Sequence, residues 1–351
     1  MFGNERDSIA VHYFDPEAAS PEDWAKLHSF RRARHAEDLP GEPVLPDADF
    51  ERELRLHRPL GESRRFIATR QGEFVGNLIL MFRRDGSPGC EDFAAHVDAA
   101  GGVLRACRRQ GIGRALARTL LAFMQAQGRT TATFKVHLPD GNAFMAALGA
   151  VGKYHSAENR LRLDALDWPS LARWREAVPL AADGLRWEVH AGRVPMARLG
   201  QLMAPFSALI NEQPLDALEV PRMRYELPGY VTWYEDMDRR GGEHFLVLLC
   251  HGDEVAAMCD ASWDARFPER VYQQLTAVAR PWRGRGLAKA VKAAMLELVH
   301  TRHPGVRTMI THNAHANAPM LSINERLGFA RHRDDRTYQL DRAVLASALA
   351  R

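Results

Sequence analysis

Two short segments of the sequence combine arginine with closely spaced glycines. Residues 283–288 read Arg-Gly-Arg-Gly-Leu-Ala, and residues 108–113 read Arg-Arg-Gln-Gly-Ile-Gly. Glycine lets the main chain approach a ligand closely, and the first N–H groups of a helix have no partner within that helix. A glycine-rich turn that opens a helix is therefore an anion site at the positive end of the helix dipole. The chemistry that these residues predict is the binding of a phosphate or pyrophosphate group.

Two common phosphate-binding patterns fit these segments poorly. Neither segment contains the G-x-x-x-x-G-K-[ST] pattern of a P-loop. The dinucleotide-binding pattern needs a third glycine, and Lys289 stands at that position after Gly284 and Gly286. Both segments instead follow the pattern [Q/R]-x-x-G-x-[G/A].

The two segments belong to a longer internal repeat. Residues 103–116 and 278–291 align without gaps at an offset of 283 − 108 = 175 residues. Asn142 matches Asn317 at the same offset, and each is followed three residues later by methionine. Further on, a Leu-Gly pair at 148–149 matches one at 327–328. A repeat of this length indicates duplicated domains.

The elements around the loops also repeat. We expect strand pairs at 65–69 with 75–82 and at 245–250 with 255–259, each joined by a glycine-containing turn. Helices are expected from Gly113 to about Gln127 and from Gly286 to about His300, whereas residues 139–141 are expected to form a turn before Asn142. The sequence predicts domains at 1–165 and 185–351, with a short helical linker at 166–184.

The second loop and its surroundings resemble the GNAT superfamily of N-acetyltransferases. The strand ending at Val278, the loop and the long helix are similar to the superfamily's pyrophosphate loop, and residues 311–329 resemble its second signature, which ends in Leu-Gly-Phe. The resemblance implies an α/β (α+β) fold with two tandem GNAT-like domains. Each would have a mixed, mostly antiparallel sheet flanked by helices, in an arrangement similar to mycothiol synthase.

The resemblance also implies the cofactor, acetyl-CoA, and the residues that hold it. In the second domain these are Val278, Arg283, Gly284, Arg285, Gly286, Leu287, Ala288, Asn313 and Asn317. Their counterparts in the first, degenerate domain are Arg108, Gly111 and Gly113. No metal is implied.

The superfamily's usual acid and base are missing at the matched positions. The base would lie four or six residues before Val278, where this chain has Gln274 and Tyr272. Glutamine cannot act as a base, and tyrosine has a pKa near 10. The usual acid, a tyrosine, is replaced by Asn324.

Three side chains are therefore candidate catalytic residues: Tyr272, Glu226 and Asp260. The function implied is acetyl transfer to a primary amine of a small-molecule acceptor, with the chemistry in the second domain. A CoA-binding regulatory module without catalysis is one alternative, and acetylation of an amino-sugar conjugate, as in mycothiol synthase, is another.

The composition of the chain limits the partners and the cellular location that we expect for it. A net charge of +3 over 351 residues argues against nucleic-acid binding. No apolar run approaches the ~20 residues that span a bilayer, and the first residues lack the pattern of a secretory signal. We expect a cytoplasmic monomer or homodimer.

Overall fold

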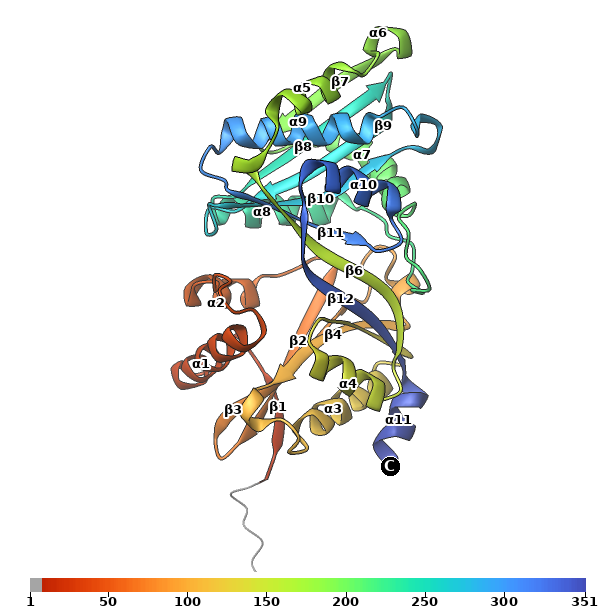
Figure 1. Cartoon of the computed structure of the whole chain (residues 1–351). Helices are drawn as coiled ribbons and strands as arrows, with labels where there is room; N and C mark the ends of the chain where they lie inside the picture. Colours follow the sequence, from red (N-terminus) through yellow and green to blue (C-terminus); the bar gives the residue numbers. More distant parts are fainter. Residues whose placement is uncertain (1–7) are drawn as a thin grey trace, which may run out of the picture. The chain divides into compact units, whose positions relative to one another are not determined.

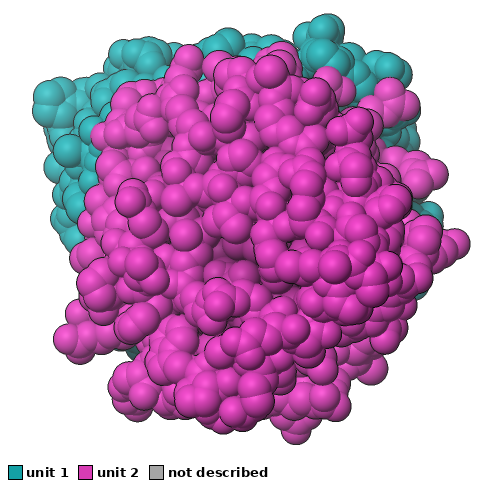
Figure 2. Space-filling model, turned by 90° about the horizontal axis from the view of Figure 1, so that it is seen from above, with its two compact units in different colours: residues 1–154, 217–221, 336–351 teal, residues 155–216, 222–335 magenta. Residues whose placement is uncertain are grey.

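The computed structural model describes residues 8–351, which form two compact units (Figure 2). The first unit contains residues up to Tyr154, together with Ala217–Pro221 and Arg336–Arg351. The second contains His155–Asp216 and Arg222–Asp335. Each unit is a sheet with helices on its faces, and each is described by itself.

The elements of the first unit follow the order strand, two helices, three strands, helix, strand, helix (Figure 1). Its elements are β1 (Ala10–Phe14), α1 (Pro21–Asp38), α2 (Asp47–Arg55), β2 (Gly61–Arg70), β3 (Glu73–Arg83), β4 (His96–Val103), α3 (Ile112–Ala126), β5 (Thr131–Val136), α4 (Pro139–Ala147) and α11 (Arg342–Ala350). The sheet order is β1-β2-β3-β4-β5, and the unit's part of β12 (Ala330–Asp341) pairs with β5. All pairs are antiparallel except β4 with β5.

The second unit has the same plan. Its elements are the part of β6 (Val151–Arg162) from His155 onward, α5 (Trp168–Glu176), α6 (Leu180–Asp183), β7 (Leu185–Ala191), α7 (Met196–Ile210), α8 (Leu227–Arg239), β8 (Glu243–His251), β9 (Glu254–Trp263), β10 (Arg270–Val278), α9 (Leu287–Arg302), β11 (Thr308–Ala314) and α10 (Ala318–Leu327). The sheet order is β7-β8-β9-β10-β11-β6, and only the β10–β11 pair is parallel.

Strand alternation separates two cores on the faces of the second sheet. One face of β8 and β9, with Val247 and Cys259, packs on α9 and α5. The other face, with Leu246 and Met258, packs on α7 and α8. Groups on β9 and β10 can therefore reach a site from either side of the sheet.

The last strand of each sheet comes from outside the expected domain. Residues 336–341 of β12 complete the first unit's sheet, and residues 156–162 of β6 complete the second's. The compact units thus differ from the expected ranges 1–165 and 185–351. The expected helical linker is also part of the second unit, because Leu171 of α5 is buried in the core beneath α9.

The expected strand pairs appear as β2–β3 and β8–β9, and both long helices begin one residue from their predicted starts. The expectation of a turn at 139–141 is wrong. Pro139 is the first residue of α4, a position that suits proline because its missing N–H would have no helical partner there. Among the described helices, none has the length and apolar character needed to cross a bilayer.

Candidate active site

The loop before α9 is shaped to receive a ligand. Gly284 and Gly286 have φ values of 79° and 78°, in the left-handed region that favours glycine. A Cβ on Gly284 would meet nothing within 4 Å, and one on Gly286 would lie 3.8 Å from the side chain of Lys289. The main chain is therefore open to a ligand at the point where the N–H groups of α9 begin.

Arg283 joins this loop to the preceding strand. Its Nε donates to the carbonyl of Val278 (3.1 Å), and its guanidinium pairs with Glu212 (2.5 Å). Arg285 lies instead over the ring of Trp282 and pairs with Asp183 (3.2 Å).

A cavity of about 660 Å³ extends from the loop to β10 and α10. It brings together seven of the expected cofactor-binding residues: Val278, Arg283, Gly284, Gly286, Leu287, Ala288 and Asn317. Arg285 and Asn313 are absent from the lining. Lys289 and Arg326 add positive charge, as an anionic ligand requires.

β10 and β11 separate at this cavity. Their pairing runs from Arg270 with Thr308 only to Tyr272 with Ile310, although β10 continues to Val278. Across β10, the Ala279 N–H donates to Ala256 (2.9 Å), so the alternation of antiparallel pairing turns the Val278 N–H away from β9. A main-chain donor thus faces the gap between the separated strands.

Three asparagines stand around α10. Asn317 caps the helix by accepting from the Met320 N–H (3.3 Å). Asn313, which does not line the cavity, accepts from the buried Asn324 amide (2.7 Å). Asn324, at the position of the usual acid, is held in this contact and cannot ionise.

These features fit acetyl-CoA. The glycine loop and the N-terminus of α9 suit a pyrophosphate, Lys289 and Arg326 supply charge, and the gap between the strands suits an extended chain that ends in a thioester.

Among the candidate bases, Asp260 lies in a buried polar chain. Asp260 is 9% exposed and accepts from His244 Nε2 (2.8 Å). His244 Nδ1 accepts from the Tyr234 hydroxyl (2.8 Å), which accepts in turn from the Val194 N–H (3.1 Å). This order of donors fixes the imidazole tautomer and holds the carboxylate in one orientation.

The other two candidates have no such support. Glu226 is half-buried at the N-cap of α8 without a capping bond from its side chain. Tyr272 is half-buried where β10 still pairs with β11. Sequence reasoning missed His244. Its distance of 16 residues from Asp260 has no motif, but the two lie diagonally across the β8–β9 hairpin, where Asp260 pairs with Leu246.

The first unit keeps the loop but fills its surroundings. Arg108 Nε donates to the Val103 carbonyl (3.1 Å), repeating the bond of Arg283 with Val278. Its guanidinium, however, pairs with Asp140 (2.8 Å) and lies 3.7 Å from both Glu37 and Asp38.

Two further side chains fill the space beside this unit's strand β4 and its glycine loop. The guanidinium of Arg34 donates to the Val103 carbonyl (2.9 Å) and lies so near Gly102 that an added Cβ would be 2.3 Å from it. Phe144 packs against Gly113, with its ring 3.3 Å from the position of an added Cβ. The space that stays open in the second unit is occupied here by the chain's own side chains.

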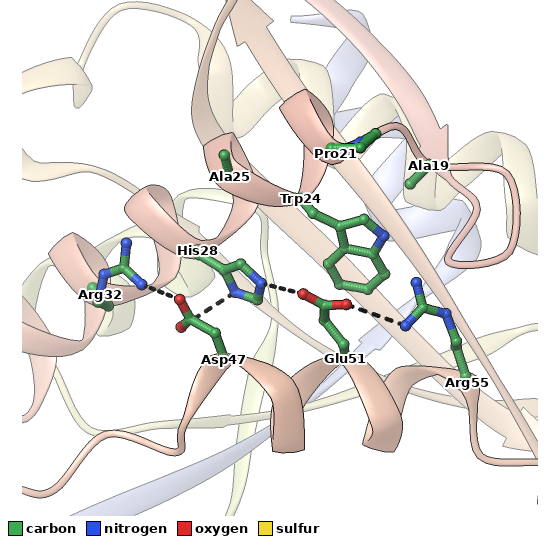
Figure 3. Close-up of a pocket in the computed structure, with 9 residues that line it drawn as sticks. All are labelled: Ala19, Pro21, Trp24, Ala25, His28, Arg32, Asp47, Glu51 and Arg55. Atoms are coloured by element: carbon green, nitrogen blue, oxygen red, sulfur yellow. Dashed lines mark hydrogen bonds and ion pairs between the residues drawn. The ribbon is translucent and has the colours of Figure 1, made fainter.

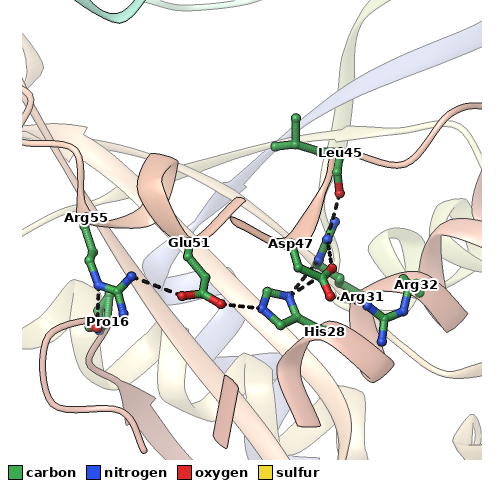
Figure 4. A network of polar contacts seen from close by, with 8 residues as sticks. All are labelled: Pro16, His28, Arg31, Arg32, Leu45, Asp47, Glu51 and Arg55. Carbon is green, nitrogen blue, oxygen red and sulfur yellow. Dashed lines mark hydrogen bonds and ion pairs between the residues drawn. The ribbon is translucent and has the colours of Figure 1, made fainter. Parts of the chain in front are cut away.

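Another cavity, of about 570 Å³, lies in the first unit between α1 and α2 (Figure 3). At its base His28 donates from Nε2 to Glu51 (2.9 Å) and accepts at Nδ1 from Arg31 (3.2 Å), while Arg55 donates to Glu51 (3.2 Å) (Figure 4). The charged side chains in this network pair with one another, so we interpret it as the contact that holds α2 against α1.

Comparison with known proteins agrees with this geometry. The model of the acetyltransferase (GNAT) family matches residues 25–149 and 208–329. No curated protein sequence matches the chain. A solved tandem GNAT protein from the clavulanic acid biosynthesis pathway is 24% identical, with a TM-score of 0.72 over 95% of this chain and 99% of its own. A GCN5-related N-acetyltransferase from Sphaerobacter thermophilus is 15% identical, with a TM-score of 0.64 over 97% and 96%. The expected fold of two tandem domains with mostly antiparallel sheets is confirmed.

Proposed function

This chain belongs to the acetyltransferase (GNAT) family, and from that membership we propose that it is an acetyl-CoA-dependent N-acetyltransferase acting through its second unit. One observation carries the proposal. A single cavity joins the open glycine loop at the start of α9 to the gap where β10 leaves β11. The first unit's copy of the loop is enclosed by Arg34, Asp140 and Phe144.

Different residues of the cavity bind different parts of acetyl-CoA in this proposal. The N–H groups after Gly286 and the side chain of Lys289 hold the pyrophosphate, and Arg283 keeps the loop attached to β10 through the Val278 carbonyl. In this proposal the Val278 N–H donates to the thioester oxygen, on which negative charge develops during attack. The bound thioester supplies the acetyl group.

Asp260 is the base in this proposal. An amine reaches the enzyme mostly as an ammonium ion and must lose a proton before or during attack. Asp260 shares a sheet face with Met258, which pairs with the cavity residue Ala277. Asp260 itself does not line the cavity; in this proposal it acts from the face of β9 that it shares with Met258, and His244 orients its carboxylate. Glu226 and Tyr272 remain weaker candidates.

The acceptor is to be found by experiment. Purified protein with acetyl-CoA should release free CoA in the presence of one class in a panel of polyamines, amino sugars, amino acids and peptide N-termini. Binding of CoA without turnover across the panel would instead support a regulatory CoA-binding module.

With an acceptor in hand, Asp260→Asn should lower kcat by about 10²–10⁴-fold, the usual worth of a general base, and leave the KM for acetyl-CoA unchanged. Asparagine keeps the size of the side chain and an oxygen for His244. Glu226→Gln is the matched control and should retain activity. Full activity in Asp260→Asn, or loss only in Glu226→Gln, would overturn the assignment of Asp260.

A further inference from the structure

A buried lysine extends from α9 toward β10 on the α9 face of the sheet. Lys292 is 1% exposed, and the polar partners of its ammonium group among the described residues include no carboxylate. Its Nζ donates to Gln273 Oε1 (2.8 Å) and lies 5.1 Å from the ring centre of Phe329. An ammonium ion with so few compensating contacts is costly to bury, and burial lowers the pKa of Lys292 to about 8.

The lysine begins a chain of hydrogen bonds that ends at the cavity. Gln273, whose carbonyl accepts from Lys292, donates from Nε2 to Thr276 Oγ1 (2.7 Å). Thr276 lines the cavity, and its hydroxyl proton is left to donate, either to the Cys259 sulfur (3.3 Å) or to a ligand. Each bond in such a series polarises the next, so a cation at one end strengthens the donor at the other.

The internal repeat shows that the hydrogen-bond series from Lys292 to Thr276 is specific to the second unit. At the offset of 175 residues, Lys292 corresponds to Ala117 and Gln273 to Asp98. Thr276 corresponds to Gly101, where a Cβ would lie 2.1 Å from the Asn77 carbonyl oxygen. The unit whose loop is enclosed thus lacks all three members, whereas the unit with the open cavity has them.

We propose that Lys292 and Gln273 polarise Thr276 so that its hydroxyl donates a hydrogen bond to the sulfur of CoA as that sulfur leaves. This inference rests on the proposed acetyl transfer. The new bond forms between the amine nitrogen and the carbonyl carbon, and the C–S bond breaks with its electron pair on sulfur. The amine proton passes to Asp260, on the opposite face of the sheet.

The position of Thr276 suits this role. A pyrophosphate at the loop places the rest of CoA along β10, and Thr276 is the cavity-lining residue of β10 farthest from the loop. Stabilisation of a thiolate by Thr276 would also account for a working site in which Asn324 replaces the usual acid. Thr276 is the group that touches the sulfur, while Lys292 and Gln273 are positioning residues.

Ionisation of bound CoA tests this without an acceptor. The thiol of CoA bound to the wild-type protein is titrated by its ultraviolet thiolate absorbance at saturating CoA. Lys292→Met and Thr276→Val should each raise the pKa of the bound thiol by about one unit, or tenfold in the ionisation constant. Thr276→Ser keeps the hydroxyl and should retain the wild-type value.

Lys289→Met is the matched control on the same helix, because Lys289 lines the cavity at the loop and lies over Trp174 instead of joining the chain. It should weaken CoA binding and leave the pKa of the bound thiol unchanged. Cys259 is the titratable group whose charge acts on Lys292, and Cys259→Ala should leave the effect of Lys292→Met in place. If CoA binds but its thiol titrates alike in the wild type, Lys292→Met and Thr276→Val, the inference is wrong and the proposed function stands. If CoA does not bind the wild type, both are wrong.

Discussion

At the scale of single residues, the burial of Lys292 has a cost that depends on pH. Its pKa in the folded protein, about 8, is below the ordinary value of 10.5, so the unfolded chain binds more protons between these values. The free-energy cost of burying the charged lysine is therefore largest below pH 8, and this cost disappears as the pH rises toward 10.5.

Lys292→Met should remove the penalty. The difference in unfolding free energy between variant and wild type should favour the variant most at pH 7 and shrink by roughly 3 kcal/mol toward pH 10.5. Loss of a donor to Gln273 offsets part of the gain at every pH. Urea unfolding of both proteins from pH 7 to 10.5 measures this. Buried thiols such as Cys259, whose pKa burial raises to about 11, titrate in both proteins, so the difference is the informative quantity. A difference independent of pH would mean that Lys292 titrates normally.

Residues of the site could be predicted where they are contiguous in the sequence. Arg283, Gly284 and Gly286 form one recognisable loop with one physical purpose. His244 and Lys292 could not be found this way. A histidine in a strand and a lysine on a helix have many ordinary roles, and only the pairing of β8 with β9 and the packing of α9 on β10 reveal their contacts.

At the scale of elements, α10 is positioned by its cap. Asn317 both lines the cavity and accepts the Met320 N–H, so Asn317→Ala should cost about 1 kcal/mol of stability and weaken CoA binding several-fold. Thermal unfolding and calorimetric titration with CoA measure the two effects. Asn142→Ala is the control. Asn142 lies inside α4 and accepts from the Tyr338 hydroxyl, so its loss should not change CoA affinity. Unchanged affinity in Asn317→Ala would remove α10 from the binding site.

The β2–β3 and β8–β9 hairpins and the helices after the two glycine loops followed from hydrophobic patterns and turn residues. The start of α4 did not. Residues Pro139, Asp140 and Gly141 favour a turn when considered locally, but proline and an acid also suit the first turn of a helix. Local sequence does not decide between these two outcomes, and packing of Met145 in the core does.

At the scale of the whole molecule, the repeat predicted two related domains but not their exchange of closing strands. The register of β6 with β11 and of β12 with β5 depends on pairings between residues more than 140 positions apart, as between Ser156 and Ala314. No local pattern records such a pairing. The repeat does record divergence, because Gly113 and Asp140 stand where the second half has Ala288 and His315.

The central claim is that the second unit's loop binds acetyl-CoA and the first unit's loop does not. Gly286→Asp and Gly111→Asp test it as a matched pair, since both glycines cap a helix with similar φ values, 78° and 84°. The strain from an added side chain is therefore alike, and only the effect on a bound pyrophosphate differs. We predict that calorimetric titration with CoA shows one site per chain in the wild type and in Gly111→Asp, and at least a 100-fold loss of affinity, about 3 kcal/mol, in folded Gly286→Asp. Unchanged affinity in Gly286→Asp, or loss of the site in Gly111→Asp alone, would contradict the account.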